Sequence, residues 1–180
     1  SLGNGRVLFQ EIGQLLADNV VHGCTGLTVA QLLLGLAFKL RFFHLDADNC
    51  GQTLADILAG SDTRLLFVGG AGSLYTNPER TETLADGKDF PEAIRPLAQA
   101  MKKSLGYLRT RNDVRWTYIS PAAVFLADGP RTGFYELTGE DFTVNKDGKS
   151  EISYADYAIA MVDEIEHGNH IRERISVRWA

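Results

Sequence analysis

The stretch Arg64-Leu-Leu-Phe-Val-Gly-Gly-Ala-Gly-Ser73 carries the strongest fold signal in the chain, because a short apolar run passes directly into a glycine-rich segment. Such a run is typical of a strand that lies inside a parallel sheet and is buried on both faces. Glycines directly after a strand allow a tight turn. We therefore expect a central parallel strand over residues 64–68, followed by a loop over residues 69–73 at its carboxyl end.

Helix and strand patterns alternate after this loop. A polar loop is expected over residues 74–89, and a 3.6-residue apolar period then predicts a long amphipathic helix with Pro91 in its first turn. The next strand, residues 114–119, is ended by Ser120-Pro121, because proline cannot donate to a central ladder. Ser153-x-x-Asp156 has the form of a capping box and opens the last helix, and a strand over residues 174–179 ends the chain.

Two parts of the chain have weaker patterns. Short β-like pieces and glycine-containing turns over residues 122–152 predict a hairpin or an excursion from the main sheet. Toward the N-terminus, a helix is expected over residues 5–17, and residues 28–40 suit either a buried helix or a strand. A short helical pattern within residues 46–60 is expected to end at Gly60 as a C-cap.

Because parallel neighbouring strands need a crossover helix between them, this alternation predicts an α/β fold. We expect a three-layer arrangement with a mainly parallel sheet. The chain length of 180 residues suits one domain that spans residues 1–180.

The composition limits the partners. A net charge of −5 provides no basic surface for nucleic acid. The longest apolar stretch, residues 32–40, is too short to span a bilayer, and no signal peptide is recognisable, so we expect a cytoplasmic protein without a membrane partner. Cys24 and Cys50 have no ligand spacing and are expected to be reduced thiols.

Three runs carry a family resemblance: LLFVGGAGSL (65–74), WTYISPAAVF (116–125) and ISYADYAIAMVDEIEHGNHIRERISV (152–177). They resemble the C-terminal two-thirds of the atypical short-chain dehydrogenase/reductases, in the group of NADH-flavin reductase-like or NAD(P)H-binding (NmrA-like) proteins. Their order and spacing extend the resemblance over residues 63–180.

The resemblance implies a Rossmann fold that binds NAD or NADP across the carboxyl ends of its strands. The loops that follow the two predicted strands occupy those positions. The cofactor-binding residues that this implies are Gly69, Gly70, Ala71, Gly72, Ser120, Pro121 and Ala122. From spacing alone, the glycines could equally form an ordinary strand-to-loop turn.

The N-terminal part departs from the family pattern, in which an apolar strand runs into a G-x-x-G-x-x-G turn. Gly3, Asn4, Gly5 and Arg6 resemble the middle of that turn and are further candidates for cofactor binding, but Leu8 stands where the last glycine is expected. Residues 19–63 are also too few for the strands and helices that a complete Rossmann half would place there, since each βαβ unit takes about 30 residues or more, so the cofactor half is assigned to residues 1–62. We expect this half to be altered or incomplete. We favour the interpretation that segments are missing from these 180 residues, because a protein that had lost central strands would expose the apolar faces and unpaired edges of their neighbours.

Candidate catalytic residues are Ser73 and Lys103. Short-chain reductases use a Tyr-x-x-x-Lys pair for proton exchange, but Gln99 stands at the tyrosine position four residues before Lys103. Lys103 is therefore expected to contact the ribose or nicotinamide, or else to be a solvated surface lysine. Ser73 could bond a substrate oxygen or merely nearby backbone.

Other polar and aromatic residues favour structural roles. The histidines show no metal-ligand spacing, and His167 and His170 are expected at the surface after a helix. Tyr154 and Tyr157 lie on the apolar stripe of the last helix, so we expect core packing with hydroxyls at its rim.

The resemblance implies an NAD(P)H-dependent oxidoreductase that passes hydride to a small acceptor, with FMN, FAD or a quinone as candidates. The rival hypothesis is a non-catalytic NAD(P) sensor, which the absent tyrosine supports equally well, and a third is a structural remnant without a ligand. The expected partners are the dinucleotide and the acceptor, and the expected state is a monomer or homodimer.

Overall fold

The computed structural model describes residues 50–180. The segments predicted over residues 5–17 and 28–40 and the candidate turn from Gly3 to Arg6 lie outside the described residues.

Helices and strands alternate along the described chain. The α-helices are α3 (Cys50–Ile57), α4 (Arg95–Arg109) and α5 (Tyr154–His167). Short 3₁₀ helices cover Ala71–Ser73, Leu84–Asp86 and Glu92–Ile94. The strands are β1 (Arg64–Val68), β2 (Arg115–Ser120), β3 (Val124–Leu126), β4 (Glu136–Thr138), β5 (Glu151–Ser153) and β6 (Glu173–Arg178).

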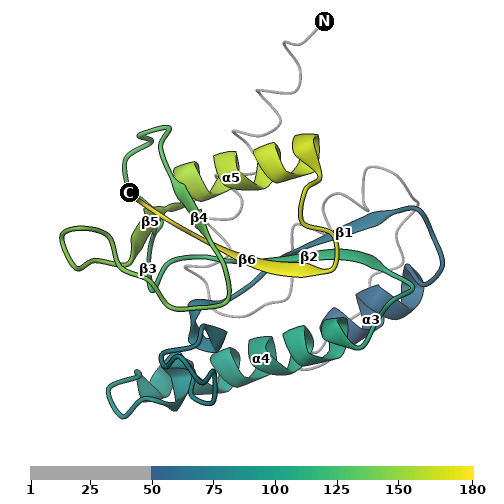
Figure 1. The fold of residues 1–180 in the computed structure, drawn as a ribbon, viewed down its shortest axis with the longest axis horizontal. Coiled ribbons are helices and arrows are strands. Elements are labelled where there is room, and N and C mark those ends of the chain that lie inside the picture. The colour runs from purple at the N-terminus through teal and green to yellow at the C-terminus, as the bar shows by residue number, and fades with distance from the viewer. Residues whose placement is uncertain (1–49) are drawn as a thin grey trace, which may run out of the picture. The chain divides into compact units, whose positions relative to one another are not determined.

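The main sheet of the described residues has the strand order β1-β2-β6-β4. β1, β2 and β6 run parallel, and β4 joins the β6 edge in the antiparallel direction. Helix α5 covers one face of this sheet, and α3 and α4 lie on the other (Figure 1). The predicted Rossmann-like, three-layer α/β fold with a mainly parallel sheet is confirmed.

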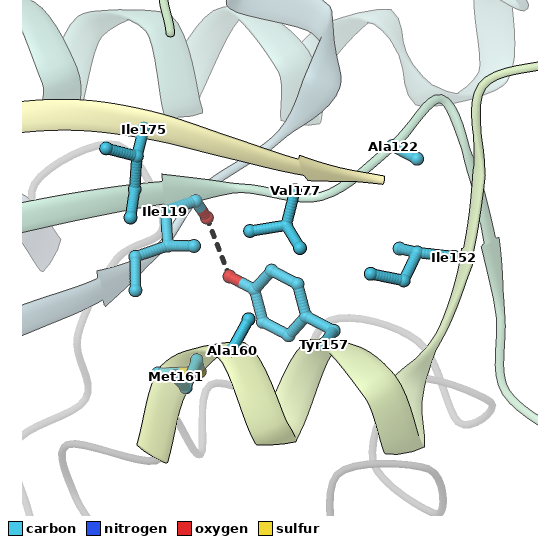
Figure 2. Packing of buried hydrophobic residues seen from close by; sticks show 8 residues of the cluster. All are labelled: Ile119, Ala122, Ile152, Tyr157, Ala160, Met161, Ile175 and Val177. Carbon is cyan, nitrogen blue, oxygen red and sulfur yellow. Dashed lines mark hydrogen bonds between the residues drawn. The ribbon is translucent and has the colours of Figure 1, made fainter. Parts of the chain in front are cut away.

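An apolar cluster fills the space between α5 and the sheet (Figure 2). Ile119 on β2 and Ile175 and Val177 on β6 face Tyr157 and Ala160 of α5. The Tyr157 hydroxyl donates to the Ile119 carbonyl at 2.6 Å, so it lies in the interior and not at the predicted rim. A hydroxyl on a buried stripe needs a partner, and the β2 backbone supplies it.

The alternate side chains of β1 and β2 pack on the α4 side. Leu65 and Phe67 are buried there with Trp116 and Tyr118. The rings of Phe67 and Tyr118 stack with centroids 5.4 Å apart and planes inclined by 8°. Burial on both faces explains why β1 is a continuous apolar run.

The segment between β2 and α5 is an excursion and not a hairpin. β3 pairs in parallel with β5 to form a separate two-stranded sheet, while β4 returns to the main sheet. The glycine-containing turns predicted within residues 122–152 do separate short strands. A turn sequence does not determine, however, with which strand each neighbouring strand pairs. The hairpin alternative is therefore wrong and the excursion is confirmed.

Two helix starts differ in detail from their predictions. Pro91 precedes the 3₁₀ helix Glu92–Ile94, and the proline in the first turn of α4 is Pro96. At α5 the Ser153 hydroxyl accepts from the Asp156 amide at 3.1 Å, which is half of a capping box. The Asp156 carboxylate does not complete the box, because it binds the loop at residues 132–133 instead. Gly60 has a left-handed φ of 70°, but it lies three residues after the end of α3 and its amide donates to the Asp113 carbonyl at 2.8 Å, so it is a turn residue and not the predicted C-cap.

Candidate functional site

The glycine-rich loop and the segment after β2 lie at the same edge of the sheet. Val68 at the end of β1 pairs with Ile119, one residue before β2 ends. The Gly69 amide then donates to the Ile119 carbonyl at 2.7 Å. This bond extends the parallel pairing by one residue and brings residues 69–73 and 120–122 together at the carboxyl ends. In open α/β sheets this edge is where ligands bind.

Close packing requires glycine at two positions of the loop. A Cβ atom at Gly69 would lie 2.1 Å from Cε1 of Tyr118, and one at Gly72 would lie 2.8 Å from Cβ of Ala98 on α4. At Gly70 a Cβ atom would meet only Met101, at 3.7 Å. Gly69 and Gly72 are therefore glycines because protein atoms fill the space of their side chains, which the spacing argument had not anticipated.

Tyr118 lies beneath this loop and is completely buried. Its hydroxyl accepts from the Gly70 amide at 3.3 Å and donates to the Met101 carbonyl of α4, also at 3.3 Å. Burial raises the pKa of Tyr118 to about 12, so the hydroxyl keeps its proton at neutral pH. Tyr118 is not among the residues predicted for the site, because a tyrosine within an apolar strand carries no site signal.

Ser73 is buried, with 4% of its surface exposed. Its hydroxyl donates to the Gly70 carbonyl at 3.3 Å. This contact matches the structural alternative, in which a serine at the end of the loop bonds nearby backbone. The catalytic role of Ser73 stays a prediction.

A cluster of charged side chains around the buried Arg174 contacts the end of the loop. The guanidinium of Arg174 bonds the carboxylate of Glu140 and donates to the Ser73 carbonyl at 3.4 Å, and Arg109 shares the same carboxylate. Burial alone would raise the pKa of Glu140, but hydrogen bonds from the two arginines hold it below its usual value. Glu140 is therefore ionised at neutral pH and ties β6, α4 and the loop together.

The second predicted segment, Ser120 to Ala122, is also buried. No surface of Ser120 is exposed, and within the described part of the chain its Oγ atom has no hydrogen-bond partner. A buried hydroxyl without a partner is costly. Ser120 is the last residue of β2, at the carboxyl end of the strand, whereas Ala122 packs into the α5 cluster.

Lys103 differs from the residues of these two loops in its exposure to solvent. It is exposed on α4, while its neighbour Lys102 binds the carboxylate of Asp86. The structure therefore groups Gly69 to Ser73 with Ser120 to Ala122, and leaves Lys103 on an open helix surface.

His170 is less exposed than predicted for the histidines after α5. Its Nδ1 atom lies 2.6 Å from the buried carboxylate of Glu164, whereas His167 is exposed. Both residues line a pocket of about 120 Å³ with Tyr135 and Asp163. In residues 50–180, no three His, Cys, Asp or Glu side chains are grouped so as to hold a metal ion. None of the helices described there is long and apolar enough to cross a membrane.

The sheet order and the loops at its carboxyl edge define the class of Rossmann-fold proteins. No family model matches the chain. The uncharacterized protein YwnB of Bacillus subtilis (strain 168) is 44% identical over 144 residues, which cover 79% of this chain and 66% of YwnB. The chain therefore spans slightly less than two thirds of this curated relative.

Two solved structures are also similar. A proposed NADH-flavin reductase from Streptococcus pneumoniae TIGR4 is 48% identical with a TM-score of 0.71, over 77% of this chain and 69% of that one. A proposed exported protein from Burkholderia pseudomallei is 36% identical with a TM-score of 0.67, over 78% and 68% of the two chains. The chain belongs to the family of NADH-flavin reductase-like Rossmann-fold proteins.

Proposed function

We propose that this protein is an NAD(P)H-dependent oxidoreductase that passes hydride to a small acceptor, a flavin or a quinone. The observation that carries the proposal is the shared sheet edge, where the glycine-rich loop and the unpartnered Ser120 hydroxyl lie side by side after β1 and β2. The similarity to the streptococcal protein described as a proposed NADH-flavin reductase supports it.

The residues that would hold the dinucleotide are Gly70 and Ala71, which are half-buried on the loop, and Ser120 at the end of β2. Gly69 and Gly72 would act indirectly, by letting the loop lie flat on Tyr118 and α4. The predicted pyrophosphate turn from Gly3 to Arg6 is part of the same proposal. A buried hydroxyl without a partner fits a polar group of the cofactor.

A bound nicotinamide supplies the hydride. The protein's part is to orient the cofactor and acceptor and to exclude water. With Gln99 at the tyrosine position and the Ser73 hydroxyl bonded to backbone, these two positions of the described residues 50–180 offer little proton delivery. A flavin or quinone requires less proton delivery than a ketone does, which favours these acceptors.

The first test is a titration of the purified protein with NADPH and NADH, followed by nicotinamide fluorescence, and then addition of FMN while the absorbance of the reduced nicotinamide is recorded. We expect saturable binding and FMN-dependent oxidation. A folded protein that binds neither dinucleotide would overturn the proposal.

The second candidate is a non-catalytic NAD(P) sensor, which the engaged Ser73 hydroxyl and the absent tyrosine favour. It predicts dinucleotide binding of the same kind, without turnover of FMN or of quinones. The titration therefore separates the two functions in one experiment.

Lys103 provides a test of the predicted ribose or nicotinamide contact. Because Lys103 is exposed, Lys103→Ala should leave the thermal midpoint unchanged. If the contact forms, the Kd for NADPH should rise about fivefold, which is roughly 1 kcal/mol. Lys102→Ala is the matched control, and an equal Kd for both variants and the wild type would show that Lys103 is a solvated surface lysine.

A further inference from the structure

We propose that Tyr118 is a positioning residue for the dinucleotide site, which fixes the backbone of the glycine-rich loop through both its ring and its hydroxyl. This inference rests on the proposed function. It concerns a residue that touches neither cofactor nor acceptor, because Gly69 covers the Tyr118 ring and the Tyr118 hydroxyl already bonds the Gly70 amide and the Met101 carbonyl.

The ring determines how closely the loop can approach the sheet. Cε1 of Tyr118 lies where a side chain at position 69 would be, 2.1 Å from an ideal Cβ atom. Phe67 stacks on the ring with an interplanar angle of 8°. Since Phe67 and Tyr118 are paired directly across β1 and β2, the ring has one place to lie. Gly69 therefore rests on a rigid aromatic surface.

The hydroxyl determines the direction of the loop backbone after Gly69. It accepts from the Gly70 amide and donates to the Met101 carbonyl, so one oxygen joins the loop to α4. Gly70 is half-buried, whereas Gly69 before it is buried. Along the loop, Gly70 is therefore the first residue that we propose to face the dinucleotide. Without the hydroxyl, the Gly70 amide would be free to turn and the loop could rotate away from α4.

Arg174 holds the other end of the loop. Arg174 is paired with Tyr118 across β2 and β6, and its side chain is fully buried. Arg174 also donates to the Ser73 carbonyl, so the two ends of the loop are held by adjacent residues of the sheet. The arrangement places Tyr118 under the start of the loop and Arg174 under its end.

The test is Tyr118→Phe, which keeps the ring and removes only the hydroxyl. Tyr135→Phe is the matched control, because it removes a hydroxyl that bonds Asp163 at 2.6 Å on the α5 side of the sheet. The first readout is hydrogen exchange of the peptide that contains residues 68–74, measured without any cofactor. We expect about tenfold faster exchange of the Gly70 amide in Tyr118→Phe and no change in Tyr135→Phe, in line with the loss of about 1.4 kcal/mol of local protection.

The second readout is the Kd for NADPH of both variants, with the far-ultraviolet spectrum as a folding control. Tyr118→Phe should raise the Kd about fivefold, and Tyr135→Phe should leave it unchanged. Unchanged exchange at Gly70 in a folded Tyr118→Phe protein would overturn the positioning role. Altered exchange with an unchanged Kd would overturn its link to the cofactor, whereas a wild-type protein that binds no dinucleotide would count against the proposed function and leave the exchange result valid.

Discussion

Gly69→Ala is expected to lower the free energy of unfolding by about 3 kcal/mol, because the new methyl group would enter the ring of Tyr118. The ideal Cβ atom lies 2.1 Å from one ring carbon and 2.6 Å from another. Neither side can yield easily, since the ring is fully buried and the Gly69 amide is bonded to Ile119. Urea unfolding of the wild type and of Gly69→Ala measures this loss of unfolding free energy, as a lower midpoint with an unchanged m-value.

Gly70→Ala is the matched control one residue further along. Its methyl group would meet only Met101, at the ordinary contact distance of 3.7 Å, and position 70 has no left-handed backbone conformation. We expect a change below about 0.5 kcal/mol for this variant. Equal urea midpoints for the two variants would show that the Tyr118 ring does not restrict the loop.

Asp156→Asn is expected to cost about 3 kcal/mol or more, because a buried carboxylate is the acceptor for several donors at once. It accepts from the Thr132 hydroxyl at 2.6 Å, the Gly133 amide at 2.9 Å and the Trp179 indole at 2.7 Å. An asparagine side chain replaces one acceptor oxygen by a donor, which would face another donor. Thermal or urea unfolding measures the cost.

Asp163→Asn is the control, because Asp163 is half-buried and accepts from the Tyr135 hydroxyl. It should cost about 1 kcal/mol. A cost for Asp156→Asn as small as that of Asp163→Asn would contradict the proposed importance of the buried network.

The Asp156 network also predicts a pH dependence. Burial would raise the pKa of Asp156, but the hydrogen bonds from Thr132, Gly133 and Trp179 hold it below its usual value of 3.8. The unfolded chain therefore binds this proton at a higher pH than the folded chain, so the stabilisation is complete above pH 3.8 and is lost as the pH falls toward the folded pKa. Acid unfolding of the wild type should thus be steeper than that of Asp156→Asn.

Local patterns predicted the elements that have strong periodicity. The apolar run of β1, the 3.6-residue stripe of α4, the stop at Pro121 and the N-cap Ser153 all depend on neighbours within a few residues, and all are found in the structure. The pairing of β4 with β6 joins residues about 40 positions apart, so no local pattern could reveal it. The partners of Asp156 lie 23 or 24 positions away, which is also beyond the reach of a local pattern.

In the candidate site too, some features could be predicted from local sequence and others depend on tertiary contacts. The sequence by itself determined where the glycine-rich loop and the Ser120-Pro121 stop fall, since glycine, proline and strand patterns act on the adjacent backbone. Only the tertiary structure decided why Gly69 is a glycine, that Tyr118 lies beneath it, and that Ser120 is buried without a partner. Those properties arise when parallel strands and a crossover helix enclose a side chain, and the free energy that selects the residue then comes from contacts between segments distant in sequence.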